Sequence, residues 1–135
     1  MKIEYEINDK SAKKVLERLY RNNHNRRAAM KDITRILMKS TDDTFEKEGR
    51  QPKWPKLKKP RPGKILQLSK KLINSMNGSS DNDSSTLATS VIYGPTHQYG
   101  DPERNISKRT FLEIRREDIK NSQMVLTKHL MRGIT

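Results

Sequence analysis

The sequence contains no cysteine, which excludes disulfide cross-links, thiol nucleophiles and thiolate metal sites together. Aromatic residues are scarce, at 5%, and no apolar run approaches the roughly 20 residues that a membrane-spanning helix needs. The first nine residues, MKIEYEIND, also lack the apolar core of a signal peptide. We therefore expect no membrane segment, a reducing environment, and a chain that is made and kept in a cytoplasm.

Hydrophobic residues are also few: they make up 31% of the chain, whereas charged residues make up 33%. A chain of this composition can bury only a modest core, and much of its surface must be strongly solvated. Its 135 residues fall within the usual size of one domain. We expect a single domain over residues 1–135.

Positive charge is in excess, because 29 Lys and Arg residues stand against 16 Asp and Glu, for a formal net charge of +13. This balance favours an anionic neighbour, either nucleic acid or an acidic protein surface. The excess is concentrated in a segment without any acidic residue, residues 50–64. The predicted anion contacts there are Arg50, Lys53, Lys56, Lys58, Lys59, Arg61 and Lys64. The alternative interpretation is a solvated loop that only keeps the protein soluble.

The same segment is rich in proline, with four prolines and one glycine in residues 51–63. Neither a helix nor a central strand can run through such a sequence, so we predict an extended arm or loop at residues 50–64. Trp54 and Leu57 are its only large apolar residues. They are predicted to pin the arm to a core or to a neighbouring subunit, and a linker with Trp54 exposed is the alternative.

Three helices are predicted from apolar residues at helical spacing. They cover residues from about 9 to 23, from about 25 to 46, and from about 116 to 131. The apolar stripes predicted to face inward are Ala12, Val15, Leu16, Leu19 and Tyr20 in the first helix, Met30, Ile33, Leu37 and Phe45 in the second, and Ile119, Leu126 and Leu130 in the last.

Strand patterns are shorter. Residues 3–7 alternate with period two, and residues 86–93 and 110–114 are rich in β-branched and apolar types. Residues 77–85 form a polar turn sequence, and residues 65–76 suit a short helix that passes into a strand. The predicted fold class is α+β, with a small, mostly antiparallel sheet packed with two N-terminal helices and one C-terminal helix, plus the extended Pro-rich basic arm.

Catalytic patterns are not found. The three histidines, His24, His97 and His129, have no metal-binding spacing, and the sequence has no phosphate loop, nucleophile elbow or paired carboxylates in a recognisable context. His97 lies beside Gln98 at the end of a predicted strand, where we expect it to bond the backbone rather than to transfer protons. The sequence predicts no enzyme activity, no cofactor and no metal.

Several short motifs follow one another in order: Trp54-Pro-Lys-Leu57, Leu66-Gln-Leu-Ser-Lys-Lys-Leu72, Tyr93-Gly94, His97-Gln-Tyr-Gly100, and Ile106-Ser-Lys-Arg109-Thr-Phe111-Leu. As an ordered set they resemble the phage virion morphogenesis family, the tail completion proteins of contractile-tailed phages of the Mu type, over roughly residues 45–119. The chain departs from the family pattern at a few positions. Lys70 stands where the family favours Gly, Ser107 and Glu113 replace Pro and Gly, and Gly94 replaces Ala.

The resemblance implies a structural protein that completes the tail or joins it to the head by binding other phage tail or neck proteins. It implies a homo-oligomer, with a ring as one form, that is located in the bacterial host cytoplasm during assembly and then in the virion. The interface or fold-setting residues that it implies are Trp54, Leu57, Leu66, Leu72, Tyr93, His97, Gln98, Tyr99, Gly100, Arg109 and Phe111. Replacement of Trp54 by Ala is expected to leave the monomer folded and to impair assembly.

The alternative hypothesis is a free nucleic-acid-binding protein, based on the net charge and the lysine-rich arm. Against it, only Trp54 supplies an aromatic ring within the basic run, and no nucleic-acid reader motif is found. Contact with DNA inside the assembled particle fits both hypotheses. A hydrolase, the third class that we considered, lacks a matching set of acidic or metal-binding residues.

Overall fold

The computed structural model describes residues 10–67 and 69–134, so the strand predicted at residues 3–7 lies outside the described residues. The helices are α1 (Lys10–His24), α2 (Arg27–Glu46), α3 (Lys71–Asn74), α4 (Gly94–Tyr99) and α5 (Arg116–Leu130). One antiparallel hairpin is formed by β1 (Asn77–Ser80) and β2 (Ser85–Ala88). The predicted α+β class is confirmed, and the three long helices begin and end within two residues of their predicted limits.

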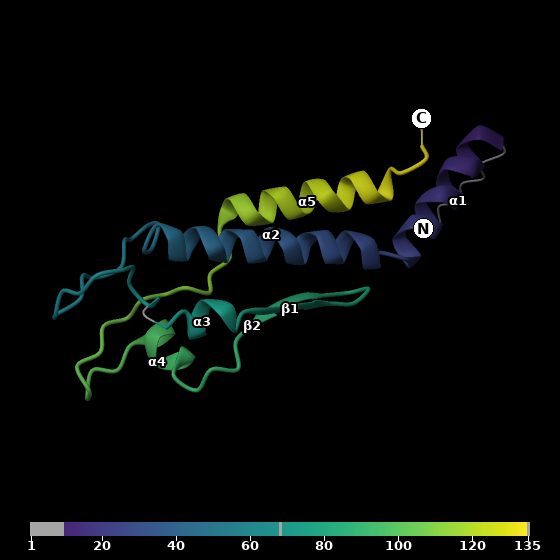
Figure 1. Cartoon of the computed structure of the whole chain (residues 1–135). Helices are drawn as coiled ribbons and strands as arrows, with labels where there is room; N and C mark the ends of the chain where they lie inside the picture. The colour runs from purple at the N-terminus through teal and green to yellow at the C-terminus, as the bar shows by residue number, and fades with distance from the viewer. Residues whose placement is uncertain (1–9, 68, 135) are drawn as a thin grey trace, which may run out of the picture.

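Helix α2 is the central layer of the molecule, with α5 along one side and the β1–β2 hairpin along the other (Figure 1). Its buried positions are Ala29, Ile33, Thr34, Ser40, Thr41, Thr44 and Phe45. Many of them are small or hydroxylated, which lets neighbouring elements approach closely. Thr34 and Thr44 bond the carbonyls of Met30 and Ser40 one turn earlier, at 3.0 and 3.1 Å, so their hydroxyls are satisfied inside the helix.

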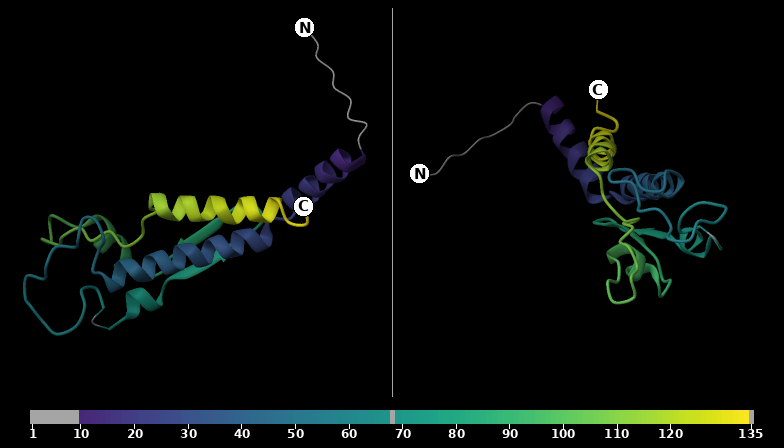
Figure 2. Two further views of the ribbon diagram at one scale, coloured as in Figure 1. Left: turned by 90° about the horizontal axis from the view of Figure 1, so that it is seen from above. Right: turned by 90° about the vertical axis from the view of Figure 1, so that its left-hand side faces the viewer.

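Helix α1 differs from its prediction, because none of its residues is buried. Its apolar face was expected to face inward, yet Val15, Leu16 and Tyr20 are 37%, 50% and 64% exposed. The helix extends beyond the ends of α2 and α5 instead of lying on the sheet, and it contacts only the end of α5 closely (Figures 1 and 2). The hairpin therefore packs on α2, not on both N-terminal helices.

The start of α5 is also rotated relative to its prediction. Ile119 was expected to face inward but is 49% exposed, whereas Asp118 is buried. The carboxylate of Asp118 accepts a hydrogen bond from the backbone N–H of Arg115 at 3.0 Å, which caps the helix. The same carboxylate accepts from the Ser40 hydroxyl of α2 at 2.8 Å, and this contact, rather than the apolar stripe, fixes which face of the first turn lies inward.

The hairpin differs from its prediction in both strands. Residues 77–80, predicted as part of a turn, form β1, and the turn is confined to residues 81–84. Asp81 closes this turn by accepting from the N–H groups of Asp83 and Ser84 at 2.8 and 2.7 Å, and these bonds lower the pKa of Asp81. The second strand was predicted to reach residue 93 but ends at Ala88, because the Thr89 hydroxyl accepts from the N–H of Val91 at 3.2 Å and starts a turn.

Two further local predictions are wrong. Residues 94–99, expected as a turn and loop, form helix α4, with Pro95 in its first turn, where its fixed φ suits a helix start. Residues 110–114, predicted as a strand, form no strand. In place of a neighbouring strand, the side chain of Gln98 bonds their backbone, as described below.

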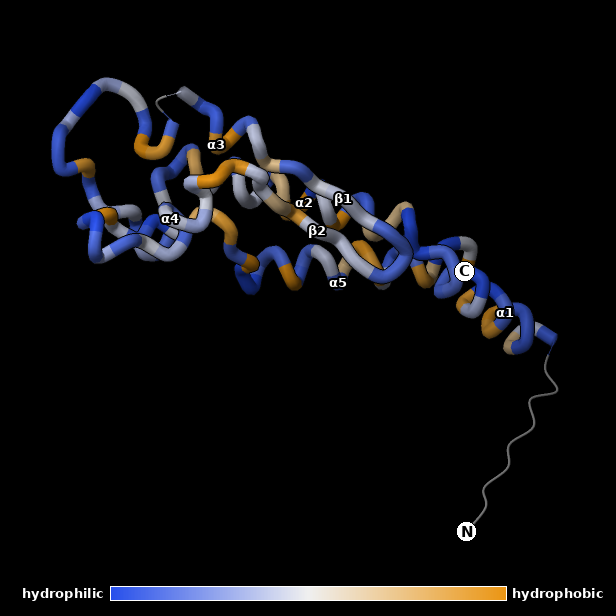
Figure 3. Tube along the Cα trace, turned by 90° about the horizontal axis from the view of Figure 1, so that it is seen from below, coloured by the Kyte–Doolittle hydropathy of each residue, from blue (hydrophilic) through white to orange (hydrophobic). Residues whose placement is uncertain are grey.

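The hydrophobic core lies at the end of the molecule opposite α1. It consists of Phe45, Trp54, Ile65, Leu72, Met76 and Phe111. The rings of Phe45 and Trp54 pack edge to face with their centroids 5.5 Å apart, and Phe45 and Phe111 lie 5.7 Å apart. Figure 3 shows hydrophobic segments gathered around α3 and the neighbouring end of α2. The core is thus built largely from loop residues that close onto the last turn of α2.

Lys70 has a backbone conformation that is uncommon for a residue other than glycine. It precedes α3 with a φ of +57°, in the left-handed region that favours glycine. The resemblance described above places a glycine at this position. A glycine would therefore adopt this backbone conformation more readily than the lysine that this chain carries.

Candidate assembly surfaces

The basic arm, residues 50–64, begins with a sharp reversal at Gly49. The φ of Gly49 is +88°, and its N–H donates to the carbonyl of Thr44 at 2.9 Å. The N–H of Trp54 then donates to the carbonyl of Glu48 at 2.9 Å. A Cβ at Gly49 would lie 2.6 Å from the Trp54 nitrogen, so only glycine fits this close approach. The reversal directs Trp54 back into the core.

Trp54 holds the arm on the body of the protein. Its side chain is buried, and its indole N–H donates to the carbonyl of Thr110 at 2.9 Å. Leu57 is half-buried and packs against the same core. The structure thus places Trp54 in the chain's own core, where a partner's pocket cannot receive it. Because truncating a buried tryptophan typically costs about 3–5 kcal/mol, we expect Trp54→Ala to destabilise the monomer as well.

Arg109 supplies a second attachment. Its Nε and Nη2 donate to the carbonyl of Pro55 at 3.0 and 2.8 Å, and Nη2 also donates to the carbonyl of Lys56 at 3.1 Å. The residue is buried, and this burial lowers the pKa of its guanidinium. The planar donor fork of arginine suits two adjacent carbonyls. Arg109 therefore fixes the arm's backbone directly after Trp54.

Gln98, on α4, ties the following segment to the same region. Its side-chain oxygen accepts from the N–H groups of Phe111 and Leu112, both at 3.0 Å, and its Nε2 donates to the carbonyl of Leu112 at 2.7 Å. One amide thus satisfies three backbone groups, as a neighbouring strand would. This arrangement places Phe111 in the core and, two residues earlier, Arg109 under the arm.

His97 has a different environment from the one predicted. Its Nδ1 is buried and has no hydrogen-bond partner in the described part of the chain, and its ring packs edge to face on Tyr93 at a centroid distance of 5.7 Å. Burial, followed by the charge of Arg109, lowers the pKa of His97. The side-chain bonds to backbone belong to Gln98, and His97 contributes its carbonyl, which accepts from the N–H of Arg109 at 2.7 Å.

The remaining motif residues take separate places. Leu72 is buried and Leu66 is half-buried in the core cluster, whereas Tyr93 and Tyr99 are 37% and 74% exposed. Gly100 ends α4 with a φ of +77°, and a Cβ there would lie 3.0 Å from the nitrogen of Lys108. The structure brings most of the predicted residues to one end of the molecule and leaves Tyr99 on its surface.

The predicted anion contacts fall into two groups. Five of them contact the protein itself. Lys53 donates to the carbonyl of Lys47 at 2.8 Å, Lys58 to that of Asn105, Lys64 to that of Glu46 at 2.6 Å, Arg61 to those of Pro62 and Lys64 at 3.0 and 3.3 Å, and Arg50 to the Ser40 hydroxyl at 2.6 Å. Lys56 and Lys59 are exposed, and neither side chain makes a hydrogen bond or ion pair with any residue from 10 to 67 or from 69 to 134.

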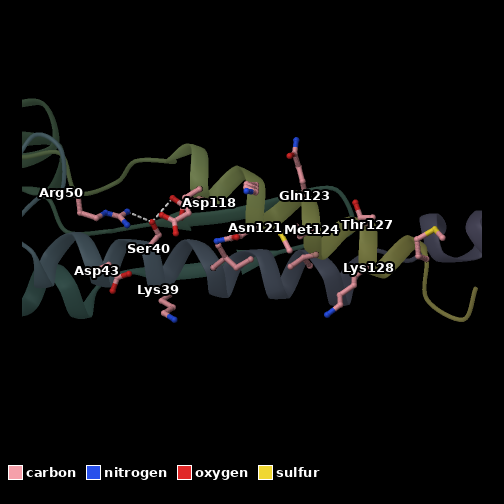
Figure 4. A pocket seen from close by; sticks show the side chains of 15 residues that line it. Lys39, Ser40, Asp43, Arg50, Asp118, Asn121, Gln123, Met124, Thr127 and Lys128 are labelled. Atoms are coloured by element: carbon pink, nitrogen blue, oxygen red, sulfur yellow. Dashed lines mark hydrogen bonds between the residues drawn. The ribbon is translucent and has the colours of Figure 1, made fainter. Parts of the chain in front are cut away.

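A groove of about 910 Å³ between α2 and α5 was not predicted from the sequence (Figure 4). At one end the side chains of Arg50, Ser40 and Asp118 form a chain: Arg50 donates to the Ser40 hydroxyl at 2.6 Å, which donates to the Asp118 carboxylate at 2.8 Å. The aspartate was predicted only as a favourable charge in the first turn of α5, and no sequence pattern links it to Ser40. Apolar groove residues are Ile36, Met124, Val125 and Met131.

No helix within residues 10–67 and 69–134 is both long enough and apolar enough to cross a membrane. The same residues contain no group of three or more His, Cys, Asp or Glu side chains that could hold a metal ion.

Comparison with known proteins gives one match. A family model described as the phage virion morphogenesis family matches residues 7–131, which includes every helix and strand described above. No curated protein and no solved structure matches the chain. The match extends the motif resemblance at residues 45–119 to α1 and to the whole of α5.

Proposed function

Because the chain belongs to the phage virion morphogenesis family, we propose that it completes the phage tail or joins it to the head by binding neighbouring virion proteins. The family gives the coarser part of this statement, a structural role in phage assembly and an association with the virion. The finer part, the tail or head–tail junction as the site of action, is our proposal, together with assembly in the host cytoplasm.

The observation that carries the proposal is the fixed basic arm. Trp54 and Arg109 attach its backbone to the core from two sides, at 2.9 Å to Thr110 and at 2.8 to 3.1 Å to Pro55 and Lys56. Between and beyond these attachments Lys56 and Lys59 face outward. A loop that is already ordered loses little conformational entropy on binding, so these charges are preorganised for a fixed neighbour.

Binding without reaction also fits the most polar part of the groove. The Asp118 carboxylate is occupied by the Ser40 hydroxyl at 2.8 Å and by the N–H of Arg115 at 3.0 Å. These contacts cap α5 and join it to α2, which is a structural use of a buried carboxylate. Ser40 in turn donates to Asp118 and accepts from Arg50, so its hydroxyl is used both as donor and as acceptor in joining these elements.

The anionic neighbour of the arm is, in this proposal, an acidic surface of another tail or neck protein. The alternative, in which the isolated chain binds nucleic acid, draws on the net charge of +13 and on the lysine-rich arm, in which the side chains of Lys56 and Lys59 make no hydrogen bond or ion pair with the described residues. Two lysines can neutralise only about two phosphates. Because the electrostatic part of nucleic-acid affinity grows with the number of phosphates neutralised, these two lysines contribute little to it. DNA within the assembled particle remains compatible with either neighbour.

A complementation experiment tests the proposal. A phage lacking this gene is supplied with wild-type protein, with the double variant Lys56→Glu and Lys59→Glu, or with the control Arg27→Glu and Lys31→Glu, which makes the same charge change at exposed positions of α2. We expect the null phage to form heads and unfinished tails by electron microscopy. Wild type and control should restore infectious particles, and the arm variant should not.

The outcomes separate clearly. Normal finished particles from the null phage would refute the proposed function. Full rescue by the arm variant would instead refute the role of Lys56 and Lys59 as contacts. A gel shift of the purified protein with duplex DNA at physiological salt serves as the second arm, and tight, stoichiometric binding there would favour the nucleic-acid alternative.

A further inference from the structure

Helix α1 presents an apolar face that nothing in the described chain covers. Leu16 and Tyr20 lie one turn apart on that face and are 50% and 64% exposed, and Val15 beside them is 37% exposed. The ring of Tyr20 packs on that of His24 with the centroids 4.1 Å apart, which restricts its orientation. Figure 3 shows hydrophobic positions of α1 at the far end of the molecule from the core. A helix of 15 residues is marginal in water without tertiary packing, so this face has the character of a contact surface for another molecule.

Polar contacts fix the direction in which α1 projects from the body of the protein. The Asn22 side-chain amide donates to the carbonyls of Leu130 and Arg132 at 2.8 and 2.9 Å. His129 donates from Nε2 to the carbonyls of Asn22 and Asn25 at 2.8 and 2.6 Å. These bonds hold one end of α1 against the end of α5, and the rest of the helix extends beyond both long helices (Figure 2). The helix is therefore placed in advance, which lowers the entropy lost when a partner binds it.

Free positive charge accompanies the apolar face. Helix α1 carries five Lys and Arg residues and one acidic residue, Glu17. Arg18 is used within the chain, since its Nε donates to the carbonyl of Arg132 at 3.1 Å. The other four cations are exposed, and their side chains make no hydrogen bond or ion pair with residues 10–67 or 69–134; they are Lys10, Lys13, Lys14 and Arg21. These charges are therefore available to the carboxylates of a partner.

The free charges and the apolar face meet in an open hollow of about 380 Å³ on the surface of α1. Leu16 and Tyr20 supply its apolar part, and Lys13, Glu17 and Arg21 line the rest. Lys13 and Arg21 lie two turns apart on one side of the helix, and with Glu17 between them the lining keeps a net positive charge. An apolar side chain held between Leu16 and Tyr20 would thus have a cation on each side of it, where neighbouring carboxylates could pair with them.

The charge and the shape of this surface distinguish between the partners that it could have. A second copy of this chain carries the same net charge of +13, so long-range repulsion opposes contact of its surface with α1. Duplex DNA would engage the cations and leave the apolar face without a partner. A membrane surface holds an amphipathic helix through a broad apolar face, whereas on α1 only Leu16 and Tyr20 are at least half exposed. An acidic protein surface with an apolar groove uses both features, and basic amphipathic helices are recognised in this way.

We propose that α1 is a docking helix for a different virion protein, one that offers an acidic groove with an apolar floor. Leu16 and Tyr20 enter the groove, and Lys13 and Arg21 pair with carboxylates at its edge. The inference rests on the proposed function and deepens it, because it adds a second contact surface at the end of the molecule opposite the basic arm (Figure 1). The protein then joins two acidic neighbours, one at each end.

Sedimentation with phage particles tests the apolar part of the contact. Heads and unfinished tails are purified from the phage that lacks this gene, and the full-length protein is titrated onto them. Leu16→Asp places a charge on the apolar face of α1, whereas the control Ile92→Asp adds the same charge at a residue that is 95% exposed and lies outside α1. Circular dichroism should confirm an unchanged fold, since no residue of α1 is buried. We expect wild type and control to bind equally and Leu16→Asp to bind at least about tenfold more weakly.

The charged part of the contact is tested with a double variant. Lys13→Glu with Arg21→Glu reverses the charge on both sides of the hollow, and Arg27→Glu with Lys31→Glu makes the same change at exposed positions of α2. We expect only the first pair to weaken binding, again by about tenfold or more, because both side chains then repel the partner's carboxylates. Raising the salt concentration should weaken binding of the wild type more than that of the α1 variant. Equal binding by the two double variants would overturn the inference.

Photo-cross-linking identifies the class of partner. Tyr20 is replaced by a photoreactive phenylalanine derivative in the full chain, and Ile92 is replaced in the same way in the control. After irradiation on the particles, mass spectrometry identifies the cross-linked peptide of the partner. We expect position 20 to capture one other virion protein at a segment rich in Asp and Glu, and position 92 not to capture that segment. Capture of a second copy of this chain alone would overturn the inference.

Three other results also overturn it. They are the absence of wild-type binding to either particle, undiminished binding by Leu16→Asp, and binding to duplex DNA or to vesicles of phosphatidylcholine and phosphatidylglycerol that is lost in Leu16→Asp. The proposed function is refuted by a different result, the formation of normal finished particles by the null phage, and binding through α1 can still be measured on those particles. The two failures are therefore distinguishable.

Discussion

Removal of the Arg109 guanidinium is predicted to release the basic arm. In Arg109→Met, the carbonyls of Pro55 and Lys56 lose three donor contacts of 2.8 to 3.1 Å, while the apolar stem of the side chain is largely kept. A net hydrogen bond from a charged donor contributes about 1.5–3 kcal/mol, and two carbonyls are served here. Relief of the cost of burying the cation offsets part of this. We expect a loss of about 2–4 kcal/mol in the free energy of unfolding.

The chain carries its own probe for this change, because Trp54 is its single tryptophan. In the wild type the indole is buried and its fluorescence emission should lie at short wavelength. Loosening of the arm should shift the emission to longer wavelength before the rest of the protein unfolds. Thermal denaturation should show a midpoint lower by roughly 10 °C, from about 3 kcal/mol in a chain of this size.

Arg61→Met is the matched control. Its guanidinium bonds only the carbonyls of Pro62 and Lys64, within the arm itself. We expect a change within about 0.5 kcal/mol, as for ordinary surface substitutions, and wild-type emission. If Arg109→Met kept the emission and midpoint of the wild type, the attachment by Arg109 would be refuted, and Trp54 alone would hold the arm.

Three further predictions use the same fluorescence signal. Gln98→Leu removes three backbone hydrogen bonds and should lower the free energy of unfolding by about 2–4 kcal/mol, measured by urea titration; a change below half of that would contradict the role of its amide. Gly49→Ala should be far more destabilising than Gly63→Ala. Both glycines have positive φ, but only at Gly49 would the new Cβ meet a backbone atom, the Trp54 nitrogen at 2.6 Å. Equal losses in the free energy of unfolding would contradict the close approach at Gly49. Burial lowers the pKa of His97 in the folded protein, so His97 is protonated in the unfolded chain first as the pH falls below about 6.5, and the free energy of unfolding should fall with the pH. His97→Gln should flatten this part of the plot of stability against pH. An unchanged slope would contradict the buried environment of His97.

The long helices and the arm were predictable because their signals are local. Helical spacing of apolar residues defined α2 and α5, and four prolines excluded regular structure from residues 51–63. The turn at Asp81 followed from its own sequence, since aspartate bonds the backbone two and three residues onward. In each case the stabilising contact lies within a few residues of the side chain that makes it.

The errors arise where a side chain replaces the partner that a pattern implies. Residues 110–114 have the composition of a strand, but Gln98 satisfies their backbone groups from 13 and 14 residues away, so no second strand is required. Asp118, not Ile119, lies on the inward face of α5, because its carboxylate accepts from Ser40 on α2. The two residues are 78 positions apart in the sequence, so no local pattern could show this contact. Hydropathy patterns contain no information on such pairings, and the groove they help to shape could not be predicted.

The apolar face of α1 shows a second limit of hydropathy patterns. Its periodicity correctly predicted a helix, but periodicity does not say whether the apolar face is buried within the chain or against another one. The structure places this helix at one end of the molecule and the basic arm at the other (Figures 1 and 2). A neighbour bound at the apolar face of α1 would therefore leave Lys56 and Lys59 accessible, so the two surfaces can be tested independently by substitution.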